Sequence, residues 1–282
     1  MYNSSYYSIF LCMSNSLIYL DGINSINVSK TTNRDEGLFL GGGLMPAIPN
    51  QQSQITISVD KSFLQHDPIY TLTGNSKIDH FYFYDGIRFL ALKDLYLNSM
   101  QASFTIGDLP KISFSLSSYN GYFVEIASLN TGSAIKYEKI IPRLNSIYID
   151  LINSSSTSNI KNNIDIYSID YSVNINRVPQ YSIGDYNEVE VIQMLPLQIS
   201  STISAKQKDF GSENYLLNPF AIRDNQFSYY DFDIKVSGSE NSITKFPIRK
   251  TILKTSERSS NSQGYLDVKY GFDGIIGGYY AD

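Results

Sequence analysis

Few side chains in this sequence could do acid–base chemistry, because His66 and His80 are the only histidines in 282 residues. His66 precedes an Asp-Pro turn and His80 opens the aromatic segment HFYFYDG, so we expect turn or packing roles for both. No G-x-S-x-G segment supplies a serine nucleophile. Asp231 and Asp233 have the spacing of paired carboxylates, but a solvated strand face produces the same pattern. We therefore expect no catalytic residues and no enzyme activity.

Two patterns that often bind ligands are incomplete in this chain. Gly41-Gly42-Gly43 suggests a phosphate-binding loop, but no Lys-Ser/Thr pair follows it. Pro46 and Pro49 also prevent the helix whose N-terminus would hold the phosphate. The single cysteine, Cys12, excludes an intrachain disulfide and a cysteine-based zinc site. We expect neither a cofactor nor a metal ion.

The composition favours contacts with other proteins over contacts with nucleic acid. The residues are 42% hydrophobic and only 17% charged, and the formal net charge is −5. Tight nucleic-acid binding needs a basic surface, which this balance does not provide. A weakly charged surface rich in Ser, Asn, Thr and Tyr suits protein–protein contact, because few like charges repel. An AT-rich genome would produce the same bias without a functional reason.

The N-terminal segment is apolar enough to raise the question of a signal peptide. No Lys or Arg precedes Lys30, however, and Ser and Asn interrupt the apolar run. The positively charged start of a secretory signal is therefore missing, and the run is too short for a membrane-spanning helix. We expect a cytosolic product with no membrane partner.

Strand-like alternation dominates the sequence and predicts a mainly β protein. The longest example lies between Tyr96 and Phe123, where the segment Gly107–Pro110 supplies a turn between two alternating arms. The apolar positions that share one parity are Met100, Ala102, Phe104 and Ile106 before the turn, and Ile112, Phe114 and Leu116 after it. This pattern predicts a long β-hairpin with one apolar face.

Helical periodicity is scarce and predicts only two short helices, over Gly86–Leu95 and over Ser212–Phe220. The loop 33–52 is long for a compact β protein, so we expect it to take part in interactions. The polar segment 151–163 predicts a linker between a first β module, 1–150, and a second half or module, 164–282; one elaborated domain is the alternative.

A faint internal echo accompanies this division. Ser25-Ile26-Asn27-Val28 resembles Ser172-Val173-Asn174-Ile175, and each is followed by a Gly-containing connection, a Pro and a second alternating strand. One strand-loop-strand unit is therefore expected to occur twice, unless the match is a coincidence in a chain rich in Ser, Asn and Ile.

The long hairpin resembles the central hairpin of the tail tube proteins of long-tailed bacteriophages. The residues that match the pattern are Tyr96, Leu97, Ser99, Ile106, Gly107, Leu109, Pro110, Ser113 and Ser115. The family's other long hairpin is similar to the segment that carries Arg177, Pro179, Gly184 and Pro196. The segment with Phe246-Pro247 before its returning strand resembles a further variant. Together these segments cover about half of the chain.

This resemblance implies an antiparallel β-sandwich or barrel whose sheets join those of its neighbours. Six such modules form a ring, and stacked rings form the tail tube through which DNA is ejected. The implied partners are further copies of this chain, other tail proteins and DNA that passes through the lumen without specific binding. The implied location is the virion tail, assembled in the host cytoplasm. The matched hairpin residues and the loop with Gly41, Gly42 and Gly43 would serve assembly.

Several alternatives remain open at this point. Two fused modules would give a trimeric ring, whereas one elaborated module would give a hexamer. A tail hub or terminator would have the same features, and so would a capsid or decoration protein. A β-sandwich that binds carbohydrate or a receptor through its tyrosines is the alternative outside phage structure.

Overall fold

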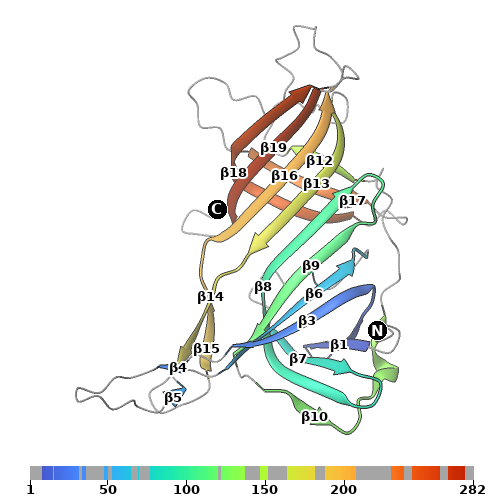
Figure 1. Cartoon of the computed structure of the whole chain (residues 1–282), viewed down its shortest axis with the longest axis vertical. Coiled ribbons are helices and arrows are strands. Elements are labelled where there is room, and N and C mark those ends of the chain that lie inside the picture. Colours follow the sequence, from blue (N-terminus) through green and yellow to red (C-terminus); the bar gives the residue numbers. More distant parts are fainter. Residues whose placement is uncertain are drawn as a thin grey trace, which may run out of the picture.

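The computed structural model shows a mainly β protein (Figure 1). It describes residues 8–14, 16–31, 34–35, 48–49, 53–64, 69, 77–119, 122–136, 147–151, 164–181, 188–207, 230–237, 243–260 and 266–276. Within these ranges there is no α-helix, and the only helical turn is a short 3-10 segment, η3 (Thr131–Ser133). The expectation of a mainly β class is therefore confirmed.

The strands follow one another along the whole chain. The first eleven are β1 (Ser8–Met13), β2 (Ser16–Leu20), β3 (Ile23–Thr31), β4 (Arg34–Asp35), β5 (Ile48–Pro49), β6 (Gln54–Ser62), β7 (Lys77–Tyr84), β8 (Phe89–Thr105), β9 (Lys111–Ser118), β10 (Val124–Ile126) and β11 (Ile135–Lys136). The others are β12 (Ile147–Leu151), β13 (Ile164–Asn174), β14 (Arg177–Tyr181), β15 (Glu188–Gln193), β16 (Leu197–Gln207), β17 (Tyr230–Ser237), β18 (Ile243–Ser260) and β19 (Leu266–Ile276).

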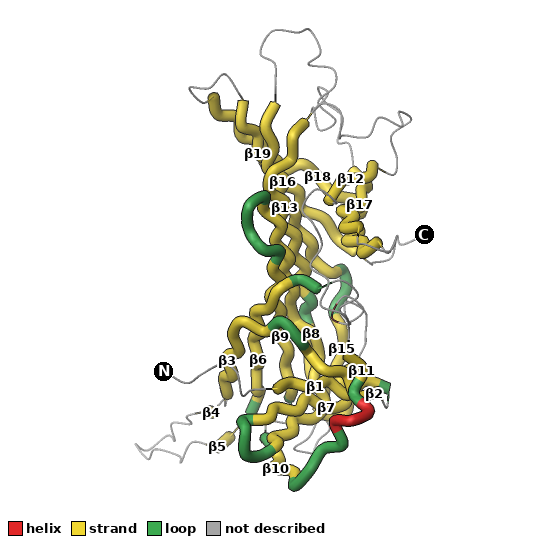
Figure 2. Tube along the Cα trace, turned by 90° about the vertical axis from the view of Figure 1, so that its right-hand side faces the viewer, coloured by secondary structure: helices red, strands yellow, loops and turns green. Residues whose placement is uncertain are grey.

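Most of these strands belong to one large mixed sheet, in which only the β2–β11 pair is parallel. Its central part has the order β3-β6-β9-β8-β13-β16-β19-β18, and all of these pairs are antiparallel. Figure 1 shows these strands following one another across the molecule, and Figure 2 shows the sheet passing from the β3 end to the β19 end. The described strands do not close into a barrel.

The same strand order occurs twice in this sheet. The first group runs β3-β6-β9-β8-β7-β1, and the second runs β13-β16-β19-β18-β17-β12. Numbered along the chain within each group, both orders are 2-3-6-5-4-1, and all neighbours are antiparallel. A two-stranded ribbon is inserted at the same point in each group: β4–β5 between β3 and β6, and β14–β15 between β13 and β16. The weak sequence echo therefore coincides with a repeated topology.

The two groups join through β8 and β13. Seven consecutive pairs link them, from Ser168 opposite Thr105 to Asn174 opposite Ser99. The amide of Ile175 extends the joint by donating to the carbonyl of Asn98 at 2.7 Å. A single sheet thus crosses from one group to the other without a break.

An aromatic cluster lies beneath this joint and contains side chains from both groups. The ring centroid of Phe63 lies 5.0 Å from that of Phe104 and 5.9 Å from that of Phe246. Tyr171 adds a further contact, with its centroid 5.2 Å from that of Phe246. All four side chains are buried, so the hydrophobic core is continuous across the two groups.

The predicted helix over Gly86–Leu95 is wrong, because Phe89 onward forms the start of β8. The side chain of Asp85 accepts hydrogen bonds from the amides of Ile87 and Arg88, which makes a turn rather than a helix start. Asp94 has a positive φ of 56°, and both Leu92 and Leu95 are fully buried. This local break in strand alternation imitates a helical spacing. The second predicted helix, Ser212–Phe220, lies outside the described residues.

All three hairpins expected from the sequence are present. β8 and β9 form the first, β13 and β16 the second, and β17 and β18 the third. In the second hairpin the ribbon β14–β15 continues the pair away from the main sheet (Figure 1). Only short parts of loop 33–52 are described, namely β4 and β5, and residues 152–163 of the expected linker are outside the described ranges.

Candidate assembly surfaces

The tip of the β8–β9 hairpin exposes two apolar side chains from the sequence pattern. Ile106 is 64% exposed and Leu109 is 60% exposed. Between them Gly107 has a φ of +94°, which residues with a Cβ rarely adopt, so the turn depends on glycine. Pro110 is buried instead, and its carbonyl accepts a hydrogen bond from the amide of Phe63 at 2.8 Å. The hairpin therefore presents a small apolar tip on a rigid base.

Arg177 connects the ribbon of the second group to the long strand of the first. Its Nε donates to the carbonyl of Leu97 at 3.0 Å, and its guanidinium carbon lies 5.2 Å from the ring centroid of Tyr96. Burial lowers the pKa of Arg177 from its ordinary value, with smaller opposing effects from Tyr119 and Tyr96. The structure thus brings together Leu97 and Arg177, which belong to two different segments of the sequence pattern.

The ribbon β14–β15 has one covered and one exposed face. Pro179 lies opposite Val191, which is 5% exposed, on the covered face. On the other face Val178 lies opposite Ile192, and both are 40% exposed. Exposed apolar pairs on a projecting ribbon are typical of a protein contact surface. Gly184 of this pattern and Gly41, Gly42 and Gly43 of the long loop all lie outside the described residues.

One face of the central sheet is polar across the whole row of strands. Because side chains alternate along a strand, residues paired across neighbouring strands share a face. One such row is Ser25, Asp60, Ser113, Gln101, Ser172, Ser200 and Asp273. The next row on the other face is Ile26, Val59, Phe114, Met100, Val173 and Ile199. The polar face therefore opposes an apolar one that packs into the core.

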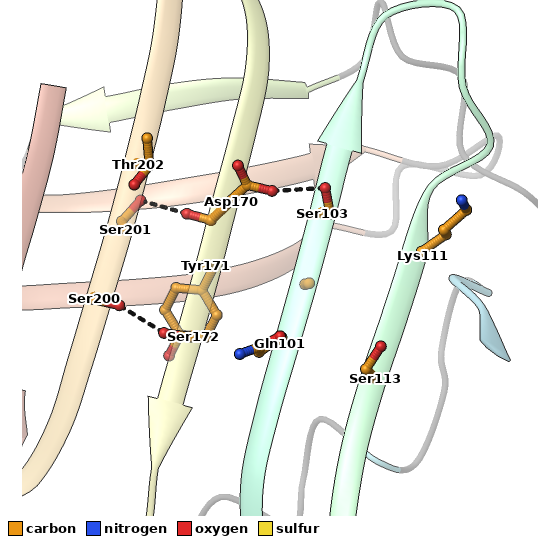
Figure 3. A pocket seen from close by; sticks show the side chains of 11 residues that line it. Gln101, Ser103, Lys111, Ser113, Asp170, Tyr171, Ser172, Ser200, Ser201 and Thr202 are labelled. Carbon is orange, nitrogen blue, oxygen red and sulfur yellow. Dashed lines mark hydrogen bonds between the residues drawn. The ribbon is translucent and has the colours of Figure 1, made fainter. Parts of the chain in front are cut away.

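Figure 3 shows the centre of this polar face, where a groove of about 340 Å³ crosses the joint between the two groups. Short hydrogen bonds tie its side chains together. Ser103 donates to Asp170 at 2.6 Å, and the hydroxyls of Ser172 and Ser200 are 2.6 Å apart. The surface thus offers small, mutually satisfied polar groups.

The exposed carboxylates of this face are already hydrogen-bonded or ion-paired. Asp60 accepts from Ser25 at 2.7 Å, and Lys254 lies 2.7 Å from Asp273. Hydrogen bonds from Ser113 and then Ser25 lower the pKa of Asp60 below its ordinary value. These acids therefore stay ionised near neutral pH, so a weak negative charge remains on the polar face.

Residues considered for chemistry have structural contacts where they are described. The His80 ring stacks on Tyr82 with centroids 5.5 Å apart, and His66 is outside the described residues. The expectation that Asp233 lies on a solvated strand face is wrong, since it is 8% exposed and pairs with Arg249 at 2.7 Å. Asp231 accepts from the amide of Lys250 at 2.6 Å.

Searches for two kinds of site gave nothing in the described part of the chain. No cluster of three or more His, Cys, Asp or Glu residues there could hold a metal ion. No helix there has the length and apolarity needed to cross a membrane.

The comparisons with known proteins identify no relative. The sequence matches no protein-family model, and no curated protein is significantly similar to it.

Proposed function

We propose that this chain is a structural protein that assembles into stacked rings, forming a tube of the kind found in the tails of long-tailed bacteriophages. The observation that carries the proposal is the repeated strand order, with two groups joined edge to edge in one continuous sheet. A protein that already joins two copies of one unit through strand pairing has the geometry to extend the same sheet between chains. In this proposal each group is a β-sandwich module.

The polar face of the central sheet would line the lumen. It carries hydroxyl and amide side chains together with carboxylates such as Asp60, Asp170 and Asp273. Affinity for DNA comes mainly from cations that neutralise phosphates. A surface that is slightly acidic and has its polar groups paired would let DNA pass with little adhesion.

The apolar hairpin tip and the exposed ribbon face would contact neighbouring rings. Ile106 and Leu109 project at one end of the β8–β9 hairpin, and Val178 and Ile192 lie on the ribbon. Burial of such side chains between rings would contribute stability in proportion to the apolar area removed from water. A hub or terminator role would use the same surfaces without repeated stacking.

The binding-module alternative has less support from the described surface. Sugar binding usually relies on exposed aromatic rings, and the only aromatic residue lining the groove is Tyr171, which is 4% exposed. Burial raises the pKa of Tyr171 to about 12, which agrees with a hydroxyl away from water.

Negative-stain electron microscopy of the purified protein, together with its mass in solution, tests the proposal. Rings or hollow tubes are the expected result, and the mass gives the number of chains in each ring. A monomer at every concentration examined would overturn the proposal and favour the binding module.

A further inference from the structure

Two strand edges of the central sheet are unpaired within the described residues. β3 pairs only with β6, and residues 252–260 of β18 pair only with β19. These two edges lie at opposite ends of the central sheet (Figure 1). An exposed edge presents main-chain donors and acceptors that pair readily with another strand.

The joint inside the chain indicates what these edges fit. In the repeated order β3 corresponds to β13, and β18 corresponds to β8. The β8–β13 joint uses seven residues of β8, Ser99–Thr105, beyond the part that pairs with β7. In β18 the seven residues 254–260 lie likewise beyond the part that pairs with β17. Both partners of the internal joint therefore have an equivalent whose edge is open.

Burial of the echo residues shows what the open edge lacks. In β13 and just after it, Val173 and Ile175 are 2% and 1% exposed, next to β8. The matching residues of β3 are Ile26, which is half-buried, and Val28, which is 46% exposed. The same apolar pattern is thus covered where a neighbouring strand is present and uncovered where it is absent.

We propose that β3 of one chain pairs antiparallel with residues 254–260 of β18 in a second copy of this chain. The central sheet would then continue from chain to chain, repeating the β8–β13 joint at every junction. Because the two edges differ, the contact is head-to-tail, and it forms a ring when the rotation between chains closes. This inference rests on the proposed function and names the contact that would form each ring.

A charge at the edge of β3 tests this pairing. Val28→Lys places an ammonium on a side chain that is 46% exposed in the single chain, so the chain should fold normally. In the joint it would occupy the place of Ile175, which is 1% exposed, and an unpaired charge there is costly. The matched control is Val124→Lys in β10, where the valine is 37% exposed and away from both edges. Light scattering measures assembly, and circular dichroism confirms the fold.

Interchain crosslinking provides a second measurement that does not depend on the stability of a charged variant. In a Cys12→Ser background, Asn27→Cys is combined in turn with Lys254→Cys, Thr255→Cys or Glu257→Cys. At least one pair should form an interchain disulfide on mild oxidation, because paired strands bring Cα atoms within about 4.4–6.8 Å. Asn27→Cys with Lys245→Cys is the control, since Lys245 pairs with β17 inside the chain.

The outcomes separate this inference from the proposed function. We expect wild type and Val124→Lys to assemble, Val28→Lys to lose at least tenfold in association affinity, and crosslinks to form only at the β18 edge. Rings from wild type and Val28→Lys alike, without these crosslinks, would overturn the strand pairing and leave the proposed function standing. A wild-type protein that never assembles would overturn both.

Discussion

Replacement of Arg177 tests the contact that ties the two strand groups together outside the sheet ladder. The guanidinium donates to the Leu97 carbonyl at 3.0 Å and lies over the Tyr96 ring at 5.2 Å. Leu97 is fully buried, and the β8–β9 register shifts between Leu97 and Ser99. A residue of the ribbon thus supplies a charged donor to a buried carbonyl next to a bulge.

The expected magnitude follows from these two contacts. A hydrogen bond from a charged donor contributes about 1.5–3 kcal/mol. A cation–π contact at a partly buried site adds about 0.5–2 kcal/mol. Burial of the guanidinium, which lowers the pKa of Arg177, offsets part of this sum. Arg177→Ala should therefore lower the free energy of unfolding by about 2–4 kcal/mol. Arg177→Lys, which keeps the charge but not the planar donor, should lower it by about 1–2 kcal/mol.

Equilibrium unfolding in urea, followed by far-ultraviolet circular dichroism at a concentration where the chain is monomeric, measures this loss. The matched control is Arg88→Ala, because Arg88 forms only exposed ion pairs with Asp85 and Glu125 and its removal should leave the midpoint unchanged. An Arg177→Ala midpoint equal to that of the wild type would refute the assigned role of the contact.

Three further predictions concern the core and the polar face. Phe246→Ala removes the ring that contacts aromatic side chains of both groups, so it should cost about 3–5 kcal/mol in urea unfolding; a cost like that of a surface substitution would contradict a shared core. Ser113→Ala should raise the pKa of Asp60 toward its ordinary 3.8, measured by carboxyl NMR titration, and an unchanged pKa would exclude this hydrogen bond. The stabilisation from ionised Asp60 is present above its unfolded-state pKa and disappears as pH falls through its lowered folded-state pKa, so in Ser113→Ala it should disappear at higher pH. Lysine at Asp60, Asp170 and Asp273 together changes the net charge by +6, from −5 to +1; assembled variant should retain DNA in a salt-dependent way that wild type does not, and equal retention would argue against a lumen on this face.

Local features of the fold could be predicted from the sequence, and features set by distant contacts could not. The β8–β9 hairpin follows from alternation on both sides of a turn in which Gly107 has positive φ. The helix predicted over Gly86–Leu95 failed because the left-handed backbone at Asp94 lets Leu92 and Leu95 both point to the core. A single-residue change in backbone conformation of this kind has no sequence signature in a charged residue such as Asp.

The candidate surfaces divide in the same way. The exposed tip residues Ile106 and Leu109 are where the hairpin pattern places them. The contact between Arg177 and Leu97 joins residues 80 positions apart, and nothing in their spacing predicts it. The burial of Asp233 with Arg249 also depends on a neighbouring strand rather than on the alternation of its own.

The sequence by itself determined that this protein is built of alternating strands with one apolar and one hydroxyl-rich face, because side-chain direction in a strand is fixed by local backbone geometry. It also contained the echo between the segments around Ile26 and Val173. Only the tertiary structure decided that the echo belongs to a repeated strand order, joined through β8 and β13, with one copy of the echo covered and the other exposed. The physical reason is that strand order depends on hydrogen bonds and burial between segments far apart in the chain, which no local pattern specifies.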